Sequence, residues 1–225
     1  MKSTLIIGLG IQGNKRKKVL NKMGVNVVTV DPYNDKANYK SVKDLNNYVL
    51  KNISHVFICT PFSQRIEYLD FFKNYNVKFL IEKPLINSNN EKNFFIKNKK
   101  ILRDKIYVSY NHRFERCLNL LKNILEKKKI GKLYFIEMTY GNGTAKDIKN
   151  SNWKDKGDAV INDLIPHLLD LNDYLFKIIP KYSKLSVKNR FENKSTDYFN
   201  VLTNFKSITL DIKVSYLFWK NYFKI

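Results

Sequence analysis

The chain's 225 residues include 44% apolar residues, enough to bury a core, which excludes disorder as an overall description. Its formal net charge of +21 comes mostly from lysines spread along the whole sequence, whereas nucleic-acid interfaces cluster their basic residues, so no nucleic-acid partner is expected. Two cysteines exclude a disulfide framework, and no apolar run approaches the ~20 residues that span a bilayer, so we expect a cytoplasmic protein with no membrane partner.

The first half of the chain alternates short apolar runs with segments of helical periodicity. The apolar runs predict strands at 3–8, 25–31, 55–61, 77–84 and 106–114. Apolar residues at helical intervals predict helices at 12–22, 44–52, 63–75 and 89–105. Strands that alternate with helices through short turns are typical of a parallel sheet with helices on both faces. We therefore predict an α/β fold with a doubly wound Rossmann domain over residues 1–116.

The second half of the chain has a different pattern. Helical spacing predicts helices at 114–129 and 162–176. Four segments alternate apolar and polar residues with a period of two, at 132–141, 183–189, 198–205 and 207–219. This alternation is typical of antiparallel strands with one solvated face. Residues 117–225 are therefore predicted to form an α+β domain with a mainly antiparallel open sheet.

The motif GLGIQG at residues 8–13 follows a predicted strand and opens a helix. In that context the first glycine permits a tight turn, the second lets the backbone approach a pyrophosphate, and the third lets helix and strand pack closely. Asp31 ends the second strand, where a carboxylate binds both ribose hydroxyls and repels a 2′-phosphate. The pattern predicts NAD in preference to NADP, and its alternative is a helix-packing turn with a surface aspartate. The predicted cofactor-binding residues here are Gly8, Gly10, Ile11, Gln12, Gly13 and Asp31.

Two more strands end in short motifs at the carboxyl edge of the predicted sheet. The motif CTP places Thr60 and Pro61 there, and EKP places Glu82 and Lys83. Ligands of open α/β sheets bind at that edge, so these residues join the predicted cofactor site. A lysine at this place can hold a nicotinamide ribose or a substrate hydroxyl, and its alternative role is a solvated charge. For Cys59 we favour a buried strand-end cysteine.

Asp163 and His167 are four residues apart in a predicted helix and therefore share one face. Hydride removal from an alcohol carbon needs a base for the hydroxyl proton, and histidine, with a pKa near neutrality, suits that task. A packed core histidine and a helix-capping aspartate are the alternatives. Because proline is tolerated in the first helical turn, Pro166 predicts a helix that begins near Asp163. No metal site is predicted.

Taken in order, these motifs resemble the Gfo/Idh/MocA oxidoreductases over essentially the whole chain. They are GLGIQG, the strand that ends in Asp31, CTP, EKP, NHRF at 111–114 and the DxxxH helix. The family includes glucose–fructose oxidoreductase, inositol dehydrogenases and several nucleotide-sugar dehydrogenases. The resemblance implies an NAD-dependent dehydrogenase that transfers hydride between the cofactor and a ring hydroxyl or ketone of a sugar, nucleotide sugar or cyclitol. It also suggests a place in surface-polysaccharide sugar biosynthesis.

The resemblance further implies roles for single residues. Lys83 is similar to the family's active-site lysine, and in some members the bond before the following proline is cis, which we also expect here. Asn111 and Arg113 resemble residues that reach the substrate. Asp163 and His167 match the family's aspartate and catalytic histidine, which also contact the substrate.

Two departures from the family pattern support a second hypothesis. Pro166 stands where members commonly have a small residue, and members usually continue for some tens of residues beyond the position of Ile225. We therefore expect an incomplete second domain, and keep a catalytically inactive NAD(H)-binding sensor or scaffold as the alternative. A homo-oligomer formed through the C-terminal sheet is a further hypothesis.

Overall fold

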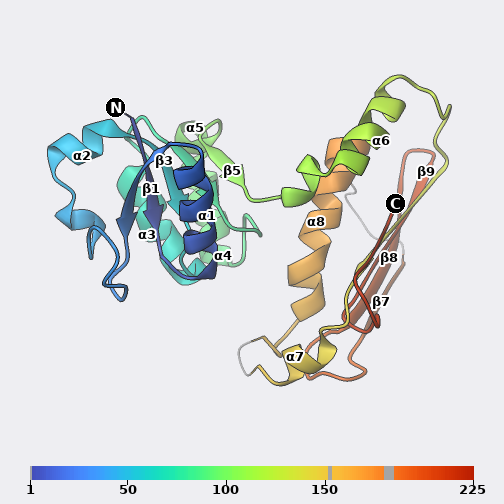
Figure 1. The fold of residues 1–225 in the computed structure, drawn as a ribbon. Coiled ribbons are helices and arrows are strands. Elements are labelled where there is room, and N and C mark those ends of the chain that lie inside the picture. Colours follow the sequence, from blue (N-terminus) through green and yellow to red (C-terminus); the bar gives the residue numbers. More distant parts are fainter. Residues whose placement is uncertain (1, 152–153, 180–184) are drawn as a thin grey trace. The chain divides into compact units, whose positions relative to one another are not determined.

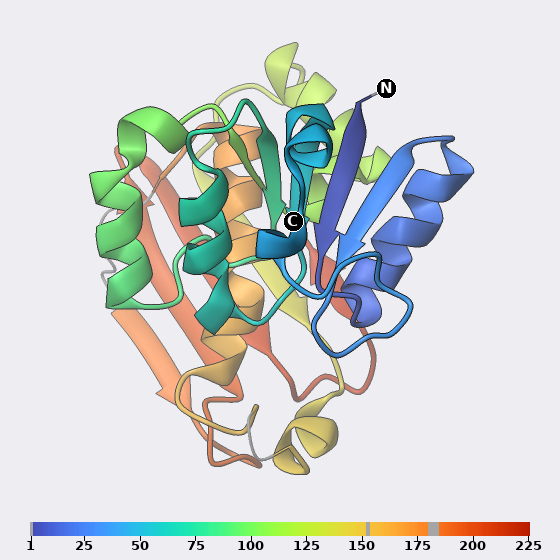
Figure 2. The same cartoon turned by 90° about the vertical axis from the view of Figure 1, so that its left-hand side faces the viewer.

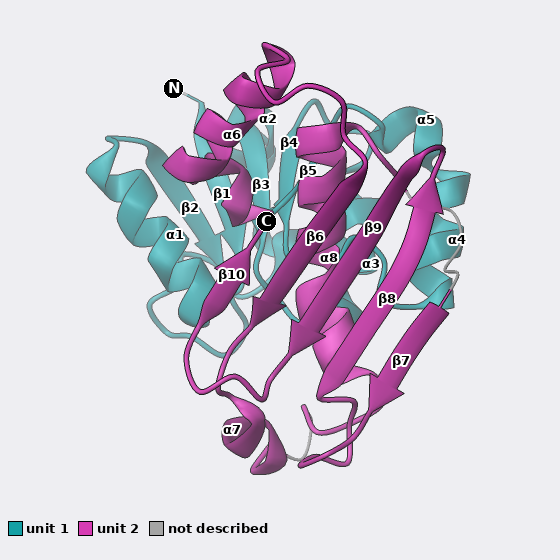
Figure 3. Cartoon of the chain, turned by 90° about the vertical axis from the view of Figure 1, so that its right-hand side faces the viewer, with its two compact units in different colours: residues 1–109 teal, residues 110–225 magenta. Residues whose placement is uncertain are grey.

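The computed structural model describes residues 2–151, 154–179 and 185–225, which form two compact units. The first unit ends at Ser109 and the second runs from Tyr110 to Ile225 (Figure 3). The sequence pattern placed this boundary after residue 116. The segment between the two positions joins the second unit because its 3-10 helix η2 (Asn111–Phe114) packs on the long helix α8 (Ala159–Phe176).

The first unit is built on five parallel strands in the order β2-β1-β3-β4-β5 (Figure 2). The strands are β1 (Ser3–Ile7), β2 (Asn26–Val30), β3 (Ile53–Ile58), β4 (Lys78–Ile81) and β5 (Ile106–Val108). The chain leaves β1 toward β2 and then returns to β3 on the other side of β1 (Figure 1). Such a reversal makes a topological switch point at the carboxyl ends of β1 and β3, where open α/β sheets bind ligands. The predicted Rossmann-type fold of this half is therefore confirmed.

Helices connect the strands of the first unit. They are α1 (Ile11–Lys22), η1 (Val42–Asp44), α2 (Asn47–Asn52), α3 (Phe62–Phe72), α4 (Asn89–Lys97) and α5 (Lys99–Leu102). Every residue of β1 is buried, as expected for a central parallel strand covered on both faces. The predicted fifth strand is too long, because β5 ends at Val108 and the chain then turns into η2.

The second unit contains a five-stranded sheet in the order β10-β6-β9-β8-β7. Its strands are β6 (Phe135–Gly141), β7 (Leu185–Asn189), β8 (Tyr198–Phe205), β9 (Ile208–Ser215) and β10 (Tyr222–Lys224). Pairing is antiparallel except between β6 and β9, which run parallel because the chain crosses the sheet through α8 between them. The sheet is thus mainly antiparallel, as predicted. The helices of this unit are η2, α6 (Arg116–Glu126), α7 (Ala145–Lys149) and α8.

One face of this sheet is covered by helices and the other is open. Alternate residues of β9, Leu210, Ile212 and Val214, are buried in the core that also contains the apolar face of α8. Asp211 and Lys213 lie between them and point to the opposite face. Figure 3 shows that no described helix of this unit crosses that opposite face. The period-two pattern therefore correctly predicted that one face of this sheet is buried.

The helix α8 begins earlier than predicted. It starts at Ala159 after the cap residue Asp158, so Asp163 does not cap it and Pro166 lies inside it. Proline removes the N–H that would bond the carbonyl four residues earlier, here Asn162, which is exposed. Solvent can satisfy that carbonyl, so the helix continues to Phe176. None of the described helices is both long and apolar enough to cross a membrane.

Candidate functional site

The glycine turn of the first unit uses each glycine differently. Gly8 has φ +89°, and a Cβ there would lie 3.1 Å from the Cys59 carbonyl oxygen. At Gly13 a Cβ would lie only 1.9 Å from the carbonyl oxygen of Gly8, so α1 packs against the turn only without a side chain. At Gly10 nothing lies within 4 Å of the Cβ position. The open space is thus at the second glycine, where a pyrophosphate approaches in this motif.

The N-terminus of α1 lies directly after that open space. No side chain caps it and its first turn contains no acidic residue, while Ile11 and Gln12 are exposed. A helix N-terminus in this state presents N–H groups and the positive end of its dipole to an anion. The turn therefore fits a pyrophosphate.

Asp31, which follows the last residue of β2, is bound to the glycine turn. Its Oδ2 accepts a hydrogen bond from the backbone N–H of Leu9 at 2.7 Å, and its Oδ1 accepts one from Tyr33 at 2.9 Å. Each carboxylate oxygen keeps a second lone pair, and the residue is half exposed. Asp31 therefore fixes the turn and retains acceptors for ribose hydroxyls.

The CTP motif ends β3 beside the same turn. The Cys59 N–H donates to the Ile7 carbonyl at 2.8 Å, so the motif continues the sheet. Burial raises the pKa of the Cys59 thiol to about 12, which agrees with a structural cysteine. Thr60 Oγ1 is buried without a hydrogen-bond partner among the described residues, and Pro61 is the exposed cap of α3.

The EKP motif follows β4 at the same edge. The Lys83–Pro84 peptide bond is cis, as the resemblance implies. Glu82 forms an ion pair with Arg16 of α1, whose guanidinium also donates to Ser109 Oγ at 2.9 Å. The Glu82 side chain is thus engaged by α1, which the sequence pattern did not indicate. Lys83 is half buried.

In the second unit, His167 lies on the face of α8 that is packed among aromatic rings. It is 8% exposed, and its ring stands edge-on to His112 at 4.9 Å between centroids. The rings of Tyr110 and Tyr140 lie 6.0 Å from it in the same edge-on arrangement. Histidine at this position is therefore held in a fixed orientation by its neighbours.

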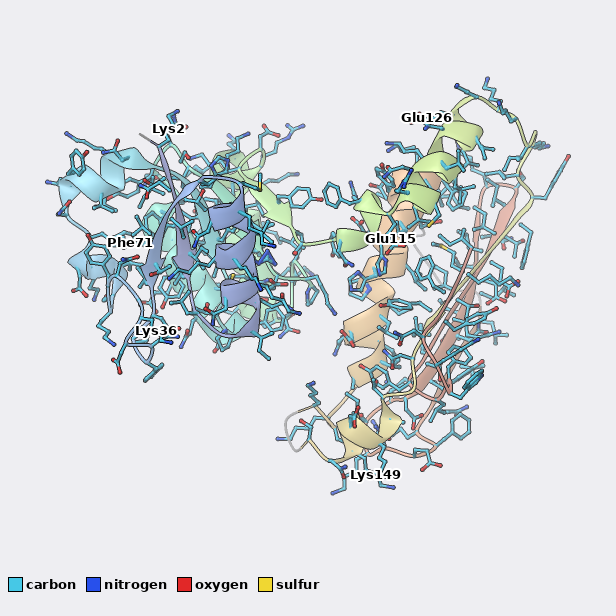
Figure 4. The ribbon with its side chains drawn as sticks, viewed as in Figure 1. Lys2, Lys36, Phe71, Glu115, Glu126 and Lys149 are labelled. Carbon is cyan, nitrogen blue, oxygen red and sulfur yellow. The ribbon has the colours of Figure 1, made fainter. Side chains whose placement is uncertain are left out.

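His112 links this group of rings to a carboxylate. Its Nδ1 lies 2.5 Å from Oε1 of Glu115, which stands at the start of α6 (Figure 4). Phe223 of β10 stacks on its other side at 5.1 Å. The sequence pattern missed His112, because nothing in the spacing of η2 and α8 marks two histidines as neighbours.

Asp163 lies one helical turn before His167 in α8, so the predicted shared helix is confirmed. Its Oδ2 accepts a hydrogen bond from the Tyr216 hydroxyl at 3.2 Å. Burial, and then the negative charge of Asp163, raise the pKa of Tyr216. The pKa of Tyr140 is raised in the same way by burial, and then by Asp163 and Glu115. Both phenols therefore stay protonated near neutral pH, and that of Tyr216 donates to Asp163.

The two predicted substrate residues of η2 differ in their surroundings. Asn111 is exposed. Arg113 donates from Nε and Nη2 to the two carboxylate oxygens of Asp170 at 2.7 and 2.6 Å, and it lies over the Tyr174 ring. This bidentate bond anchors η2 to α8, a role that the sequence did not indicate. Contact of either residue with a substrate stays a prediction.

Known proteins share this architecture. Residues 118–224 match the GFO/IDH/MocA C-terminal domain. The second unit thus matches the C-terminal domain of this family along most of its length.

A curated relative, Oxidoreductase P35 of Formosa agariphila, is 25% identical over 148 residues, which cover 60% of this chain and 44% of that protein. The chain thus aligns with less than half of that relative. An oxidoreductase of Desulfitobacterium hafniense, named as NADPH-dependent, superposes with a TM-score of 0.82 at 17% identity, covering 98% of this chain and 68% of the other. The WlbA dehydrogenase of Chromobacterium violaceum, in complex with NADH and UDP-GlcNAcA, superposes with a TM-score of 0.76 at 16% identity. This superposition also covers 98% of this chain and 68% of the other. Identities at this level establish the fold alone.

The predicted site residues divide between the units: the glycine turn, Asp31 and Lys83 lie in the first, and Asp163 and His167 lie in the second. Among the described residues, no group of three or more His, Cys, Asp and Glu side chains is arranged to hold a metal ion.

Proposed function

We propose that this protein is an NAD-dependent dehydrogenase that acts on a ring hydroxyl of a sugar, nucleotide sugar or cyclitol, or on the corresponding ketone. The observation that carries the proposal is the glycine turn with Asp31 bound to it. The space at Gly10 suits a pyrophosphate, and the half-exposed carboxylate suits unphosphorylated ribose hydroxyls. The proposed substrate class is supported by the similarity to the WlbA dehydrogenase, whose complex holds NADH and a nucleotide sugar.

Bound nicotinamide supplies the acceptor for a hydride from the alcohol carbon. The hydroxyl proton then needs a base, and we assign that role to His167. Its ring is oriented by the rings of His112 and Tyr140, which reduces the reorganisation needed for proton transfer. Loss of one hydride and one proton converts the alcohol to a ketone.

Two further residues support this chemistry. Asp163, one turn from His167, provides a negative charge on the same helix face, and Tyr216 fixes its carboxylate by a hydrogen bond. A carboxylate there favours the protonated imidazole that forms as the proton arrives. We assign to Lys83 the binding of the nicotinamide ribose, where its ammonium group offers up to three donors.

Two measurements in sequence test the proposal. Calorimetric titration with NADH and NADPH measures cofactor affinity, and turnover is then measured on a panel of nucleotide sugars, sugars and cyclitols. His167→Ala should bind NADH as the wild type does and lose turnover by 100-fold or more, on the order of a general base's contribution. His55→Ala is the matched control, because His55 is an exposed histidine of β3 in the first unit. Unchanged turnover in His167→Ala would remove this residue from the mechanism.

The alternative, an NAD(H)-binding sensor without catalysis, has a separate signature. It predicts NADH binding with no turnover on any member of the panel. The homo-oligomer expected through the C-terminal sheet stays a hypothesis, and light scattering of the purified protein tests it.

A further inference from the structure

A buried arginine lies beneath the EKP turn. Arg65, in the first turn of α3, is 2% exposed. Its Nη1 donates to the carbonyl oxygens of Glu82 at 2.7 Å and Pro84 at 2.9 Å, and its Nη2 donates to that of Leu85 at 2.9 Å. One guanidinium thus binds the main chain on both sides of Lys83.

The charge of Arg65 is balanced by an equally buried carboxylate. Glu91 of α4 is 2% exposed, and its Oε1 accepts from Nε of Arg65 at 2.9 Å and from Nη2 at 2.6 Å. Its Oε2 accepts from the backbone N–H of Asn87 at 2.6 Å. All five N–H groups of the guanidinium therefore have an acceptor, and the pair binds the segment after β4 at both ends.

Stability alone does not account for an ion pair in this place. Burial of two charges costs solvation that their attraction only partly returns, and well-packed apolar side chains of similar volume are often as stable. What the pair supplies, and apolar side chains cannot, is three directed bonds to carbonyl groups around one lysine. A planar guanidinium is suited to that task because its donors have a fixed geometry.

We propose that Arg65 and Glu91 are positioning residues that fix the Glu82–Leu85 turn and thereby hold Lys83 in the geometry needed to bind the cofactor's nicotinamide ribose. The inference rests on the proposed function for the role of Lys83. It goes further by naming the interactions on which the position of Lys83 depends. The Arg16–Glu82 ion pair acts separately, because Arg16 binds the Glu82 side chain and Arg65 binds its carbonyl.

Two variants separate positioning from stability. Arg65→Lys keeps the charge opposite Glu91 but offers three donors from one nitrogen in place of five from a planar group. The double variant Arg65→Met with Glu91→Met removes both charges and keeps similar volume, so it leaves no unpaired charge buried. Arg103→Lys is the matched control, since Arg103 is an exposed arginine in the same unit.

Three measurements are made on each full-length variant. The first gives the Tm, and the second gives kcat and KM for substrate. The third follows the rate at which Lys83 is acetylated, by mass spectrometry, with and without NADH. Positioning predicts that kcat of the double variant falls about tenfold or more when it is measured well below the Tm of that variant. NADH should protect Lys83 from acetylation in the wild type and in Arg103→Lys, and protection should be lost in both Arg65 variants.

Several outcomes decide the question. If the double variant recovers both the Tm and kcat, or if NADH protects Lys83 in it as in the wild type, the positioning role is refuted. If the wild type binds NADH but turns over no substrate, the proposed function fails, and the protection of Lys83 still tests the positioning role. The positioning role is supported if NADH fails to protect Lys83 in the Arg65 variants and still protects it in the wild type and in Arg103→Lys.

Discussion

The three glycines of the turn at residues 8–13 allow a test that separates folding from cofactor binding. Gly13→Ala places a Cβ 1.9 Å from the Gly8 carbonyl oxygen. The closest ordinary carbon–oxygen contact is roughly 3.3 Å, so α1 must retreat by about 1.4 Å. Gly10→Ala places its Cβ where nothing lies within 4 Å, and the φ of −67° at Gly10 is one that alanine adopts.

The two substitutions should therefore affect different quantities. Overpacking costs about 1–3 kcal/mol or more, and alanine in a helix returns up to about 1 kcal/mol, so Gly13→Ala should lower the free energy of unfolding by about 2 kcal/mol. For a domain of this size that is roughly 10 °C in Tm. Gly10→Ala should cost less than about 1 kcal/mol of stability. Its methyl group would occupy the space for the pyrophosphate, so NADH affinity should fall tenfold or more, about 1.4 kcal/mol.

Thermal unfolding followed by circular dichroism measures the first effect, and calorimetric titration with NADH measures the second. Gly24→Ala is unsuitable as a control because Gly24 has φ +71°, so an exposed position in α1 such as Lys18→Ala serves instead. Wild-type NADH affinity in Gly10→Ala would refute the assignment of the open space to a pyrophosphate. A wild-type Tm in Gly13→Ala would refute the packing argument.

Further predictions concern cofactor choice, thiol reactivity and acid stability. Because the Asp31 carboxylate repels a 2′-phosphate, the wild type should bind NADH more tightly than NADPH. Asp31→Asn should reduce the ratio of the two affinities about tenfold. An unchanged ratio in parallel titrations of the two proteins would contradict this prediction. At pH 8, iodoacetamide should modify exposed Cys117 and leave Cys59, since burial raises the pKa of Cys59 from 9.0 to about 12 and lowers its thiolate fraction about a thousandfold; mass spectrometry of the two peptides decides. The hydrogen bond from Lys188 lowers the pKa of Asp158, so its stabilisation is present above the unfolded carboxyl pKa and lost as the pH falls through the lower folded value. As the pH is lowered from about 5 to 2, the free energy of unfolding, measured by urea titration, should therefore fall less in Lys188→Ala than in the wild type. An equal fall in both proteins would show that the Lys188–Asp158 pair does not contribute to the acid dependence of stability.

Local patterns in the sequence were sufficient for the outline of the fold and for half of the candidate site. Alternation of strands and helices predicted the parallel sheet, and period two predicted the open sheet, because each pattern records which faces of an element are buried. The glycine motif and Asp31 were readable for the same reason, since the turn, the helix start and the end of β2 follow one another within a short stretch. The shared helix of Asp163 and His167 needed only their spacing.

The remaining features depended on contacts between residues far apart in the chain. Pro166 predicted a late start of α8, but Asn162, four residues earlier, is exposed in the folded protein, and the helix runs through the proline. No spacing rule brings His112 against His167, because η2 and α8 meet only when the second unit folds.

Arg65 is the clearest case. In the sequence it is one of three charged residues in α3, and no pattern marks it. Its acceptors come from the turn after β4 and from α4, and the guanidinium is buried only because all of them surround it. The sequence by itself predicted the residues of the candidate dinucleotide site, because that signal is local. Only the tertiary structure decided what holds Lys83 in place, because a buried charge is defined by partners that are distant in sequence.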